Sequence, residues 1–266
     1  MMTIQGADTT ISTSTTWSSD DYILQGNVTI SSGTTLTIDD LSTVDAKTYA
    51  IIVEGVLRAS NTTFFSSEPP LTGGSQGQGM WPGIHVAPGG SVYLDDVQIS
   101  NAESALYIEG SAQLNNLYLN NSYRGSRIDG GTGSATSIDI ESMDFDGVRL
   151  ESSGMLSLDQ GSFSNVSIGI QSDGFADVSN LAIHRAGIGF KGVSGQLLID
   201  QSGVYNSTIG YVSQQGVQMR VNNSLSFDTI LSLDVGDGDD FEAHHGVFEG
   251  HRFLFSSSSQ SLMLND

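Results

Sequence analysis

The sequence has no cysteine, few prolines, few basic residues and no long hydrophobic run. Without cysteine, disulfides and thiolate metal sites are excluded, although this absence does not indicate a reducing compartment. Only 9 Lys and Arg stand against 30 Asp and Glu, and the net charge of −21 disfavours nucleic acids and anionic membranes as partners. No run approaches the roughly 18 apolar residues that span a membrane. With 266 residues, the chain can still bury a substantial core.

What the sequence does have is a repeat of 20 to 22 residues. A small residue followed by two apolar residues with one other residue between them, as in the segment 147–150, recurs along the chain. Its copies begin at Gly83, Ala105, Gly125, Gly147, Gly169, Gly189, Gly210 and Ser232. Five residues before the first apolar position, most copies place an Asn or Asp: Asn101, Asn121, Asn165, Asn206 and Asp228, with Met143 and Arg185 as exceptions. Asn tolerates a left-handed backbone, so this column predicts a recurrent tight bend.

Each period contains three short segments in which apolar residues alternate with others. The third pair falls at Val97 and Ile99, Leu117 and Leu119, Met143 and Phe145, Leu181 and Ile183, and Leu225 and Phe227. Such short strands cannot pair within one repeat, so they must pair with the next repeat, one strand spacing of about 4.8 Å away. We therefore predict an all-β fold, a single-stranded right-handed parallel β-helix with coils of about 21 residues and three parallel sheets. The alternative is a β-sandwich or barrel, whose strands would not share this phase.

Several segments carry a family resemblance: VTISSGTTLTI at 28–38, GVLRASNTTFFSS at 55–67, WPGIHV at 81–86, and the coils in which Asn precedes a Gly-Ile pair, as in 165–170. They resemble the right-handed parallel β-helix repeats of the pectate-lyase-like superfamily. They are most similar to the β-helix segments of secreted and surface proteins of bacteria and archaea. The resemblance covers nearly the whole chain and implies a secreted or cell-surface location, but its motifs are architectural and specify no reaction.

The same repeat suggests how the chain is divided. We expect an N-terminal cap at 1–20 and a β-helix at 21–255, because the open end of a solenoid has to be covered. A Gly-rich loop insertion at about 68–80 interrupts the helix and is tied back by Trp81. Residues 256–266 are expected to be a C-terminal tail or linker, which would join a further domain of a larger protein or contact another subunit of an oligomer.

Outward-facing residues of the first strand in each period form a column of unusual composition. Alternate residues of a strand face opposite ways, so His85, Tyr107, Arg127, Arg149, Gln171 and Lys191 line up outside. Two residues further on, four successive coils present a carboxylate, at Glu109, Asp129, Glu151 and Asp173. Stacked carboxylates repel one another unless a cation lies beside them. Either the arginines or a bound Ca²⁺ would supply that cation, so these four residues are candidate calcium ligands.

Three interpretations of this double column stay open. The first is a solvent-exposed ladder of ion pairs that binds no ligand. The second is a groove for an acidic or hydroxylated glycan, with Tyr107 stacking on a sugar and Arg127, Arg149 and Lys191 contacting its carboxylates or sulfates. The third is an active site: the family resemblance implies acidic Ca²⁺ ligands and an arginine base on an outer sheet face, positions that Glu109, Asp129, Glu151 and Arg149 match.

A second candidate metal site lies in the segment GDGDD, where Asp237, Asp239 and Asp240 offer oxygen ligands for calcium. It partly matches the Gly- and Asp-rich calcium repeats of β-rolls. The neighbouring His244 and His245 would instead suit a transition metal, and a plain hydrophilic turn is the third interpretation. The expected cofactor is therefore either none or Ca²⁺.

The predicted function is an extracellular or cell-surface β-helix module with a structural or adhesive role, which contacts polysaccharide or surface glycan through its outward charged ladder. The alternative is a polysaccharide lyase or glycoside hydrolase that acts on an acidic polysaccharide. The sequence contains no catalytic signature segment of either enzyme class, so enzymatic activity is left undecided.

Overall fold

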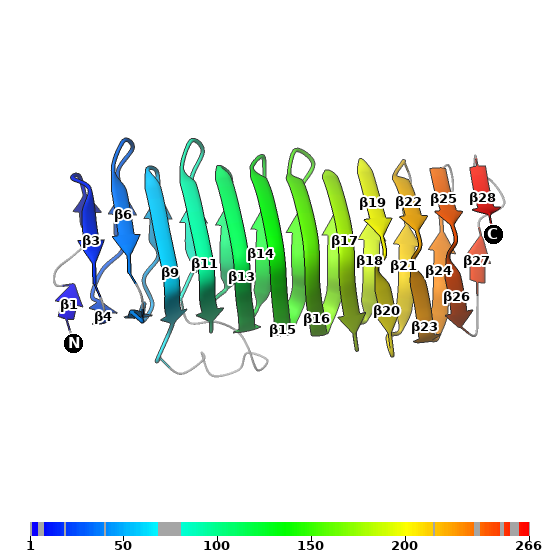
Figure 1. Ribbon diagram of the computed structural model, residues 1–266, viewed down its shortest axis with the longest axis horizontal. Helices are drawn as coiled ribbons and strands as arrows, with labels where there is room; N and C mark the ends of the chain where they lie inside the picture. Colours follow the sequence, from blue (N-terminus) through cyan, green and yellow to red (C-terminus); the bar gives the residue numbers. More distant parts are fainter. Residues whose placement is uncertain are drawn as a thin grey trace.

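The computed structural model shows a solenoid of parallel β-strands, with about 11 turns and no helix among the residues that it describes (Figure 1). These residues are 2–4, 8–18, 20–39, 41–68, 81–214, 216–236, 240–250, 253–255 and 261–265. Every strand pairing in them is parallel and joins a coil of about 21 residues to the next coil. The predicted parallel β-helix is confirmed, and a sandwich of antiparallel strands is excluded. In particular, no described segment forms a helix that is long and apolar enough to cross a membrane.

Three sheets run the length of the solenoid, and each takes one segment from every coil. Sheet I contains β1 (Met2–Ile4), β4 (Asp21–Leu24), β7 (Thr43–Asp45), the later parts of β9 (Val56–Phe65), β11 (Ser91–Ser100), β13 (Ser111–Ser122) and β17 (Phe175–His184), the middle of β15 (Thr132–Leu150) and β16 (Met155–Ser172), then β20 (Gly203–Tyr205), β23 (Leu225–Thr229) and β26 (Val247–Gly250).

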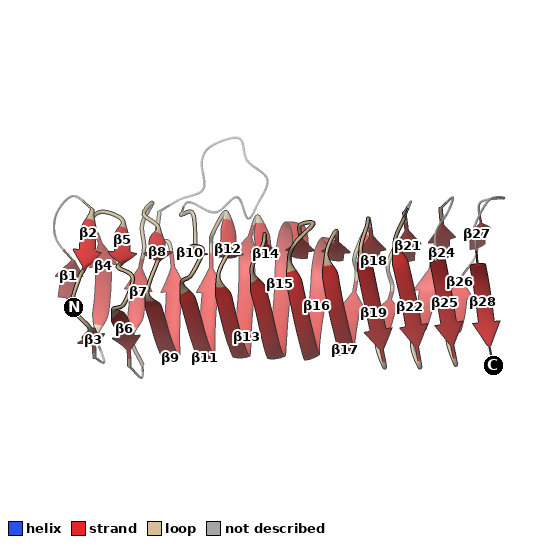
Figure 2. Ribbon diagram, turned by 90° about the horizontal axis from the view of Figure 1, so that it is seen from above, coloured by secondary structure: helices blue, strands red, loops and turns tan. Residues whose placement is uncertain are grey.

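Sheet II contains β2 (Thr9–Ile11), β5 (Val28–Ile30), β8 (Ile51–Val53), β10 (Ile84–Val86), β12 (Ser104–Ile108), β14 (Arg124–Ile128), the ends of β15 and β16, β18 (Ile188–Gly192), β21 (Ile209–Ser213), β24 (Leu231–Val235) and β27 (Phe253–Phe255). Sheet III contains β3 (Thr15–Trp17), β6 (Thr35–Ile38), the first parts of β9, β11, β13, β15, β16 and β17, then β19 (Gln196–Asp200), β22 (Gln218–Asn222), β25 (Asp240–His244) and β28 (Ser261–Asn265). Figure 2 shows sheets II and III as separate bands along the solenoid.

The core is made of inward columns, because the side-chain period of two sends alternate residues of each strand inside. On sheet II the column Ile84, Leu106, Val148, Ile170 and Phe190 is at most 2% exposed. The Phe190 ring stacks on Tyr211 of the next coil, with centroids 5.4 Å apart, and the Tyr211 hydroxyl donates to the carbonyl of Leu225 at 3.0 Å. Each fully buried large apolar side chain contributes roughly 1.5–3 kcal/mol, so the columns hold the coils together.

Two ladders of left-handed residues turn the chain between sheets. Between sheets I and II, the predicted bend column is confirmed: Asn101, Asn121, Asn165, Asn206 and Asp228 have φ between 50° and 58°, and Arg185 has the same backbone at 53°. The second ladder, between sheets III and I, has no counterpart in the predictions. Its members are Leu41, Asn61, Asp96, Asn116, Ser137, Gln160, Asn180, Gln201, Asn223 and His245, with φ from 45° to 68°.

The predicted third strand pair is wrong in two coils. In β15 the inward pair is Ile138 and Ile140, which pair in register with Leu117 and Leu119. Met143 instead pairs with Ser122 at the bend, and the strand bulges after it, between Met143 and Asp146. The left-handed residue of this coil is accordingly Ser142, with φ 60°. In β23 the strand faces the other way: Ser226 pairs with buried Val204 and points inward, and Phe227 is 50% exposed.

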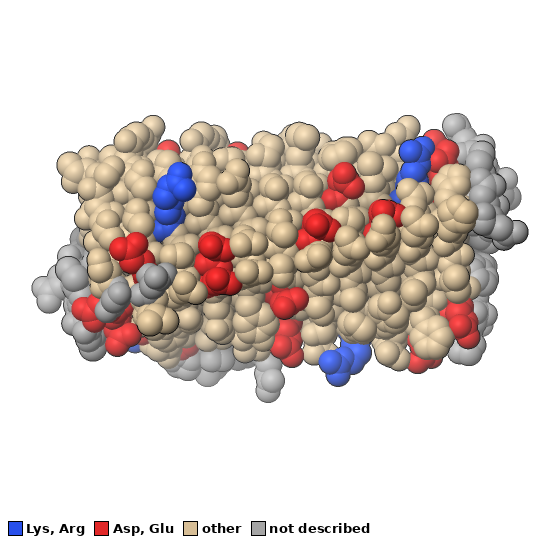
Figure 3. All heavy atoms as spheres, viewed as in Figure 1, with Lys and Arg blue, Asp and Glu red and all other residues tan. Residues whose placement is uncertain are grey.

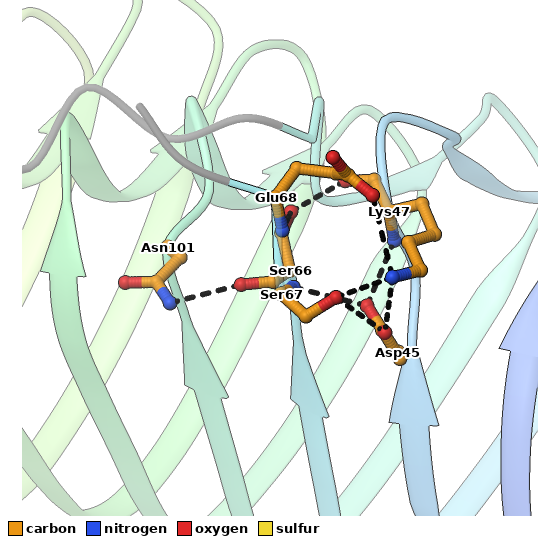
Figure 4. Close-up of polar contacts among 6 residues, drawn as sticks. All are labelled: Asp45, Lys47, Ser66, Ser67, Glu68 and Asn101. Atoms are coloured by element: carbon orange, nitrogen blue, oxygen red, sulfur yellow. Dashed lines mark hydrogen bonds and ion pairs between the residues drawn. The ribbon is translucent and has the colours of Figure 1, made fainter. Parts of the chain in front are cut away.

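The predicted insertion falls outside the described residues except for Glu68. The chain on both sides of it is fixed by contacts with neighbouring coils. Before it, Asp45 accepts hydrogen bonds from the Ser67 amide at 3.0 Å and hydroxyl at 2.7 Å, and pairs with Lys47 at 3.1 Å (Figure 4). Lys47 also pairs with Glu68 at 3.3 Å. Burial raises the pKa of Asp45, but the bonds from Ser67 and Lys47 outweigh it and lower that pKa. After the insertion, buried Trp81 bridges to the next coil.

Sheet strands also continue into the predicted end segments. Strands β1 to β3 lie in the predicted N-terminal cap and pair with β4 to β6. Strand β28 lies in the predicted C-terminal tail and pairs with β25, which extends sheet III.

Candidate functional site

The outward column of sheet II has the predicted order. In successive coils His85 pairs with Tyr107, Tyr107 with Arg127, and Arg127 with Arg149. Gln171 and Lys191 continue the column in the next two coils. Since parallel strands in register lie about 4.8 Å apart, these side chains are stacked at one-strand intervals.

The predicted acidic column lies beside it, just after each strand ends. The backbone amides of Glu109, Asp129, Glu151 and Asp173 each donate to the end of the strand in the coil before, at 2.8 to 3.0 Å. The four residues are therefore held in equivalent positions, one per coil. This register places each carboxylate next to the basic column, where the charges can pair.

The arginines and carboxylates pair both within a coil and between coils. Arg127 lies 3.2 Å from Asp129 in its own coil and 3.2 Å from Glu151 in the next coil. Arg149 donates to Glu151 at 2.9 Å. At the ends, Glu109 contacts His85 at 2.6 Å and Asp173 accepts from Ser194 at 3.1 Å. We call the set of paired residues His85, Glu109, Tyr107, Arg127, Asp129, Arg149, Glu151 and Asp173 the sheet II ladder. Arg127 lies between Asp129 and Glu151, which offsets the repulsion expected of these stacked carboxylates.

Tyr107 is enclosed within this ladder. The His85 ring stacks on it with centroids 4.7 Å apart, and the Arg127 guanidinium lies 5.0 Å from its centroid. Its hydroxyl donates to Asp129 at 3.3 Å. Burial, together with the charges of Glu109 and Asp129, raises the pKa of Tyr107. A sugar would therefore meet the edge of this ring, so the predicted stacking role stays a prediction.

Two further residues of the site, Arg124 and Asp146, were not predicted. Asp146 has no exposed surface, and its carboxyl lies 3.7 Å from Arg124 and 3.9 Å from Arg149. Neither carboxyl oxygen has a hydrogen-bond partner among the described residues. Burial raises the pKa of Asp146 to about 6, against the pull of the two arginines. The sequence did offer one sign: Arg124 and Asp146 have the same 22-residue spacing as Arg127 and Arg149.

Lys191 completes the column without joining the ion pairs. Among the described residues it has no carboxylate within ion-pair distance, and buried Gln171 separates it from Arg149. Four of the nine basic residues thus lie on sheet II, namely Arg124, Arg127, Arg149 and Lys191. This face is the part of an acidic chain where positive charge is concentrated.

The candidate calcium ligands lie in two places, at the sheet II ladder and near the start of β25. Within the part of the chain that the structure describes, no three His, Asp or Glu side chains converge as a metal site. Asp237 and Asp239 lie outside the described residues. Asp240 is exposed at the start of β25 and pairs in register with Gln218. Of the nearby histidines, His244 lies 3.8 Å from Glu242, whose closer partner is Arg220 at 2.8 Å. Calcium stays a prediction at both places.

Comparison with solved structures finds the same architecture at low sequence identity. The enzymatically active domain of bacteriophage CBA120 tailspike protein 2 is 14% identical, with a TM-score of 0.53 over 90% of this chain and 42% of that domain. The periplasmic alginate epimerase AlgG is 8% identical, with a TM-score of 0.43 over 91% of this chain and 76% of that one. The Streptococcus pneumoniae surface protein and adhesin PfbA is 11% identical, with a TM-score of 0.38 over 90% of each chain.

No protein-family model and no curated protein sequence matches this chain. The chain spans about two-fifths of the tailspike domain and shares its fold alone. The repeat and the strand pairing identify the architecture as a parallel β-helix, and the likeness to the tailspike domain agrees with this fold.

Proposed function

We propose that the chain is a β-helix module of a secreted or cell-surface protein, with a structural or adhesive role, and that the sheet II ladder contacts an acidic glycan. The observation that carries the proposal is how the arginines are held. Arg127 and Arg149 are fixed by Asp129 and Glu151, yet about a third and a quarter of their side-chain surfaces, 34% and 26%, remain exposed. Guanidinium groups fixed in this way present donors to a carboxylate or sulfate without further ordering.

Charge supports the same location. With a net charge of −21, most of the surface repels a polyanion. On sheet II the four basic side chains nearly offset the ladder carboxylates, so an acidic chain meets the least repulsion there. Because exposed charges are screened by salt, such binding should weaken as ionic strength rises.

The alternative enzyme, a polysaccharide lyase or glycoside hydrolase, has one observation in its favour. Asp146 has a pKa of about 6, within the range where a carboxyl can exchange protons near neutral pH. The side chain is fully buried, however, beneath Arg124 and Arg149. Arg149 is poorly placed to act as a base, because its guanidinium already donates to Glu151 at 2.9 Å and lies 3.9 Å from Asp146. Binding is therefore the function that the geometry supports best.

One experiment separates the two. The intact chain is incubated with uronate and neutral polysaccharides, with and without Ca²⁺, while binding and formation of unsaturated product or new reducing ends are followed. We expect salt-sensitive binding to a uronate polymer, no turnover, and loss of binding in the double variant Arg127→Gln, Arg149→Gln. Arg220→Gln, which removes an exposed arginine from the Glu242 pair, is the matched control. Turnover that disappears in Arg149→Gln would replace the adhesive role with a catalytic one.

Further parts of the proposal concern the context of the module. We expect the chain to be a module of a larger protein or a subunit of an oligomer. In an oligomer the glycan-binding face would be present in several copies, and avidity would then strengthen weak single contacts. Calcium would act at the ladder by bridging its carboxylates to those of the glycan. Added Ca²⁺ in the same assay tests this: an increase in uronate affinity that chelation reverses is the expected result.

A further inference from the structure

A groove lies on a different face, outside sheet III. It has a volume of about 460 Å³ and crosses β6, β9, β11, β13 and β15. Its floor is the outward column Thr37, Arg58, Tyr93, Gln113 and Ser134, whose members pair in register from coil to coil. Figure 3 shows the face that carries these strands as mostly uncharged, with separate charged groups. The groove is independent of the sheet II ladder.

Arg58 and Tyr93 form the central contact of the groove. The Arg58 guanidinium lies 4.1 Å from the centroid of the Tyr93 ring. Arg58 is exposed and, among the described residues, has no carboxylate within ion-pair distance, although the chain has 30 acidic residues. A guanidinium that stacks on an aromatic ring keeps its N–H donors free, because these donors point outward in the plane of the guanidinium itself.

The other polar groups of the floor are also unpaired within the protein. In the described part of the chain, the Tyr93 hydroxyl, the Gln113 amide and the Ser134 hydroxyl have no hydrogen-bond partner, and Gln113 and Ser134 are exposed. At the rim, Asn115 donates to Asp95, which fixes both side chains. The sheet II ladder is the opposite case, because its polar groups are bonded to one another. The groove therefore keeps more hydrogen-bonding capacity for a ligand.

The chemistry of the groove selects its ligand. Arg58 and Asp95 offset each other, so the lining has no net charge. The floor is the face of a sheet whose backbone groups are already bonded to neighbouring coils, so a peptide cannot add to it as a strand. Only side chains can recognise the ligand, and they offer a donor or acceptor at each strand spacing of about 4.8 Å. An extended neutral sugar chain has hydroxyls along its length at a similar interval and apolar ring faces for Tyr93.

We propose that this groove binds a neutral polysaccharide along the solenoid axis. Tyr93 contacts a sugar ring, Arg58 and Gln113 bond to its hydroxyls, and Asp95 with Asn115 closes the side. The molecule then carries two glycan-binding faces of different charge, the ladder on sheet II and the groove on sheet III.

The test is titration of the intact chain with neutral hexasaccharides (cellohexaose, xylohexaose, maltohexaose) and with hexagalacturonate, by calorimetry. We expect one neutral probe to bind, and its affinity to fall by about tenfold or more in Tyr93→Ala and in Arg58→Gln, as expected for loss of a stacking or charge-assisted contact. Two controls should bind as the parent does: Tyr118→Ala, a tyrosine of sheet I, and Arg220→Gln, an arginine of the same outward column. Circular dichroism confirms that the variants keep the fold.

Three results would overturn the proposal: no neutral probe binds, Tyr93→Ala and Arg58→Gln bind as the parent does, or the controls weaken binding equally. Binding of hexagalacturonate alone, lost in Arg127→Gln with Arg149→Gln but not in Tyr93→Ala, would also refute the groove while supporting the ladder. The two proposals can therefore fail separately.

Discussion

Asp146 provides the sharpest test of the forces at the sheet II ladder. Its side chain has no exposed surface and no hydrogen bond to either oxygen among the described residues. Burial disfavours the charged carboxylate, and the nearby Arg149 and Arg124 only partly compensate, so its pKa rises from 3.8 to about 6. The substitution Asp146→Asn keeps the shape and removes the charge.

The magnitude follows from this shift. A difference of roughly 2 pKa units at about 1.4 kcal/mol per unit corresponds to about 3 kcal/mol. Because the folded state holds the proton more tightly, unfolding releases it between pH 3.8 and about 6. Below pH 3.8, Asp146 therefore does not change the free energy of unfolding. As pH rises from 3.8 to about 6, Asp146 lowers the free energy of unfolding of the wild-type chain increasingly.

The assay compares urea unfolding of the wild type, Asp146→Asn and the exposed control Asp177→Asn at about pH 4 and pH 7.5. Relative to wild type, Asp146→Asn should gain about 2 to 3 kcal/mol between the two pH values, while Asp177→Asn should change little. Titration of the Asp146 carboxyl by NMR measures the pKa directly. A midpoint near the ordinary value of 3.8, or the same difference between wild type and Asp146→Asn at both pH values, would show that the arginines fully offset burial and would refute the reasoning.

Three further predictions test the parts that hold the solenoid. Asn165→Ala keeps a Cβ on a backbone with φ 55° but removes the polar side chain that lets Asn tolerate this conformation, so it should cost about 1 kcal/mol in thermal unfolding. Asn165→Gly should cost less, because glycine has no Cβ to strain the left-handed backbone, and equal losses would contradict the left-handed bend. Trp81→Phe removes the donor to the buried Ser100 carbonyl at 2.9 Å and should cost about 1–3 kcal/mol, with faster hydrogen exchange at residues 99–102; unchanged exchange would argue against the anchor. Asp45→Asn should destabilise the chain at neutral pH and lose this effect as pH falls below 3.8, because the lowered pKa stabilises the folded state only while the carboxyl is charged; a pH-independent loss would refute this.

The sheet II columns were predictable because two regularities combine there. The coil length stays near 21 residues and the side-chain period is two, so one correctly placed strand fixes the others. In β15 the alternation of Met143 and Phe145 imitated a strand pair at the bend, while strand pairing places Ile138 and Ile140 inside, in register with Leu117 and Leu119. The prediction that Phe227 points inward was wrong because it used hydrophobicity alone. Ser226 pairs with buried Val204, so Ser226 points inward and Phe227 points outward.

The site itself was only half predictable. Register places Arg127 beside Arg149, but the choice of Glu151 as a partner for both depends on side-chain conformations that no repeat specifies. The burial of Asp146 depends on the arginines that fold over it, and the groove beside Tyr93 depends on the shape of the sheet surface. These properties depend on how side chains pack in three dimensions. The sequence repeat predicts only which residues lie next to one another in a column.

A parallel β-helix separates the residues that hold the fold from those that meet a ligand. Backbone bonds between coils and the inward columns stabilise every coil, so an outward side chain is constrained mainly by its neighbours one coil away. The two described faces have used this freedom in opposite ways. On sheet II, the basic column and the acidic column pair with each other, so a ligand must compete with Asp129 and Glu151 for the arginines. On sheet III, Arg58 and Tyr93 leave their polar groups unpaired, so a ligand gains those bonds without breaking others. For equal contacts, the groove should therefore bind more tightly than the ladder, although the ladder holds more charge.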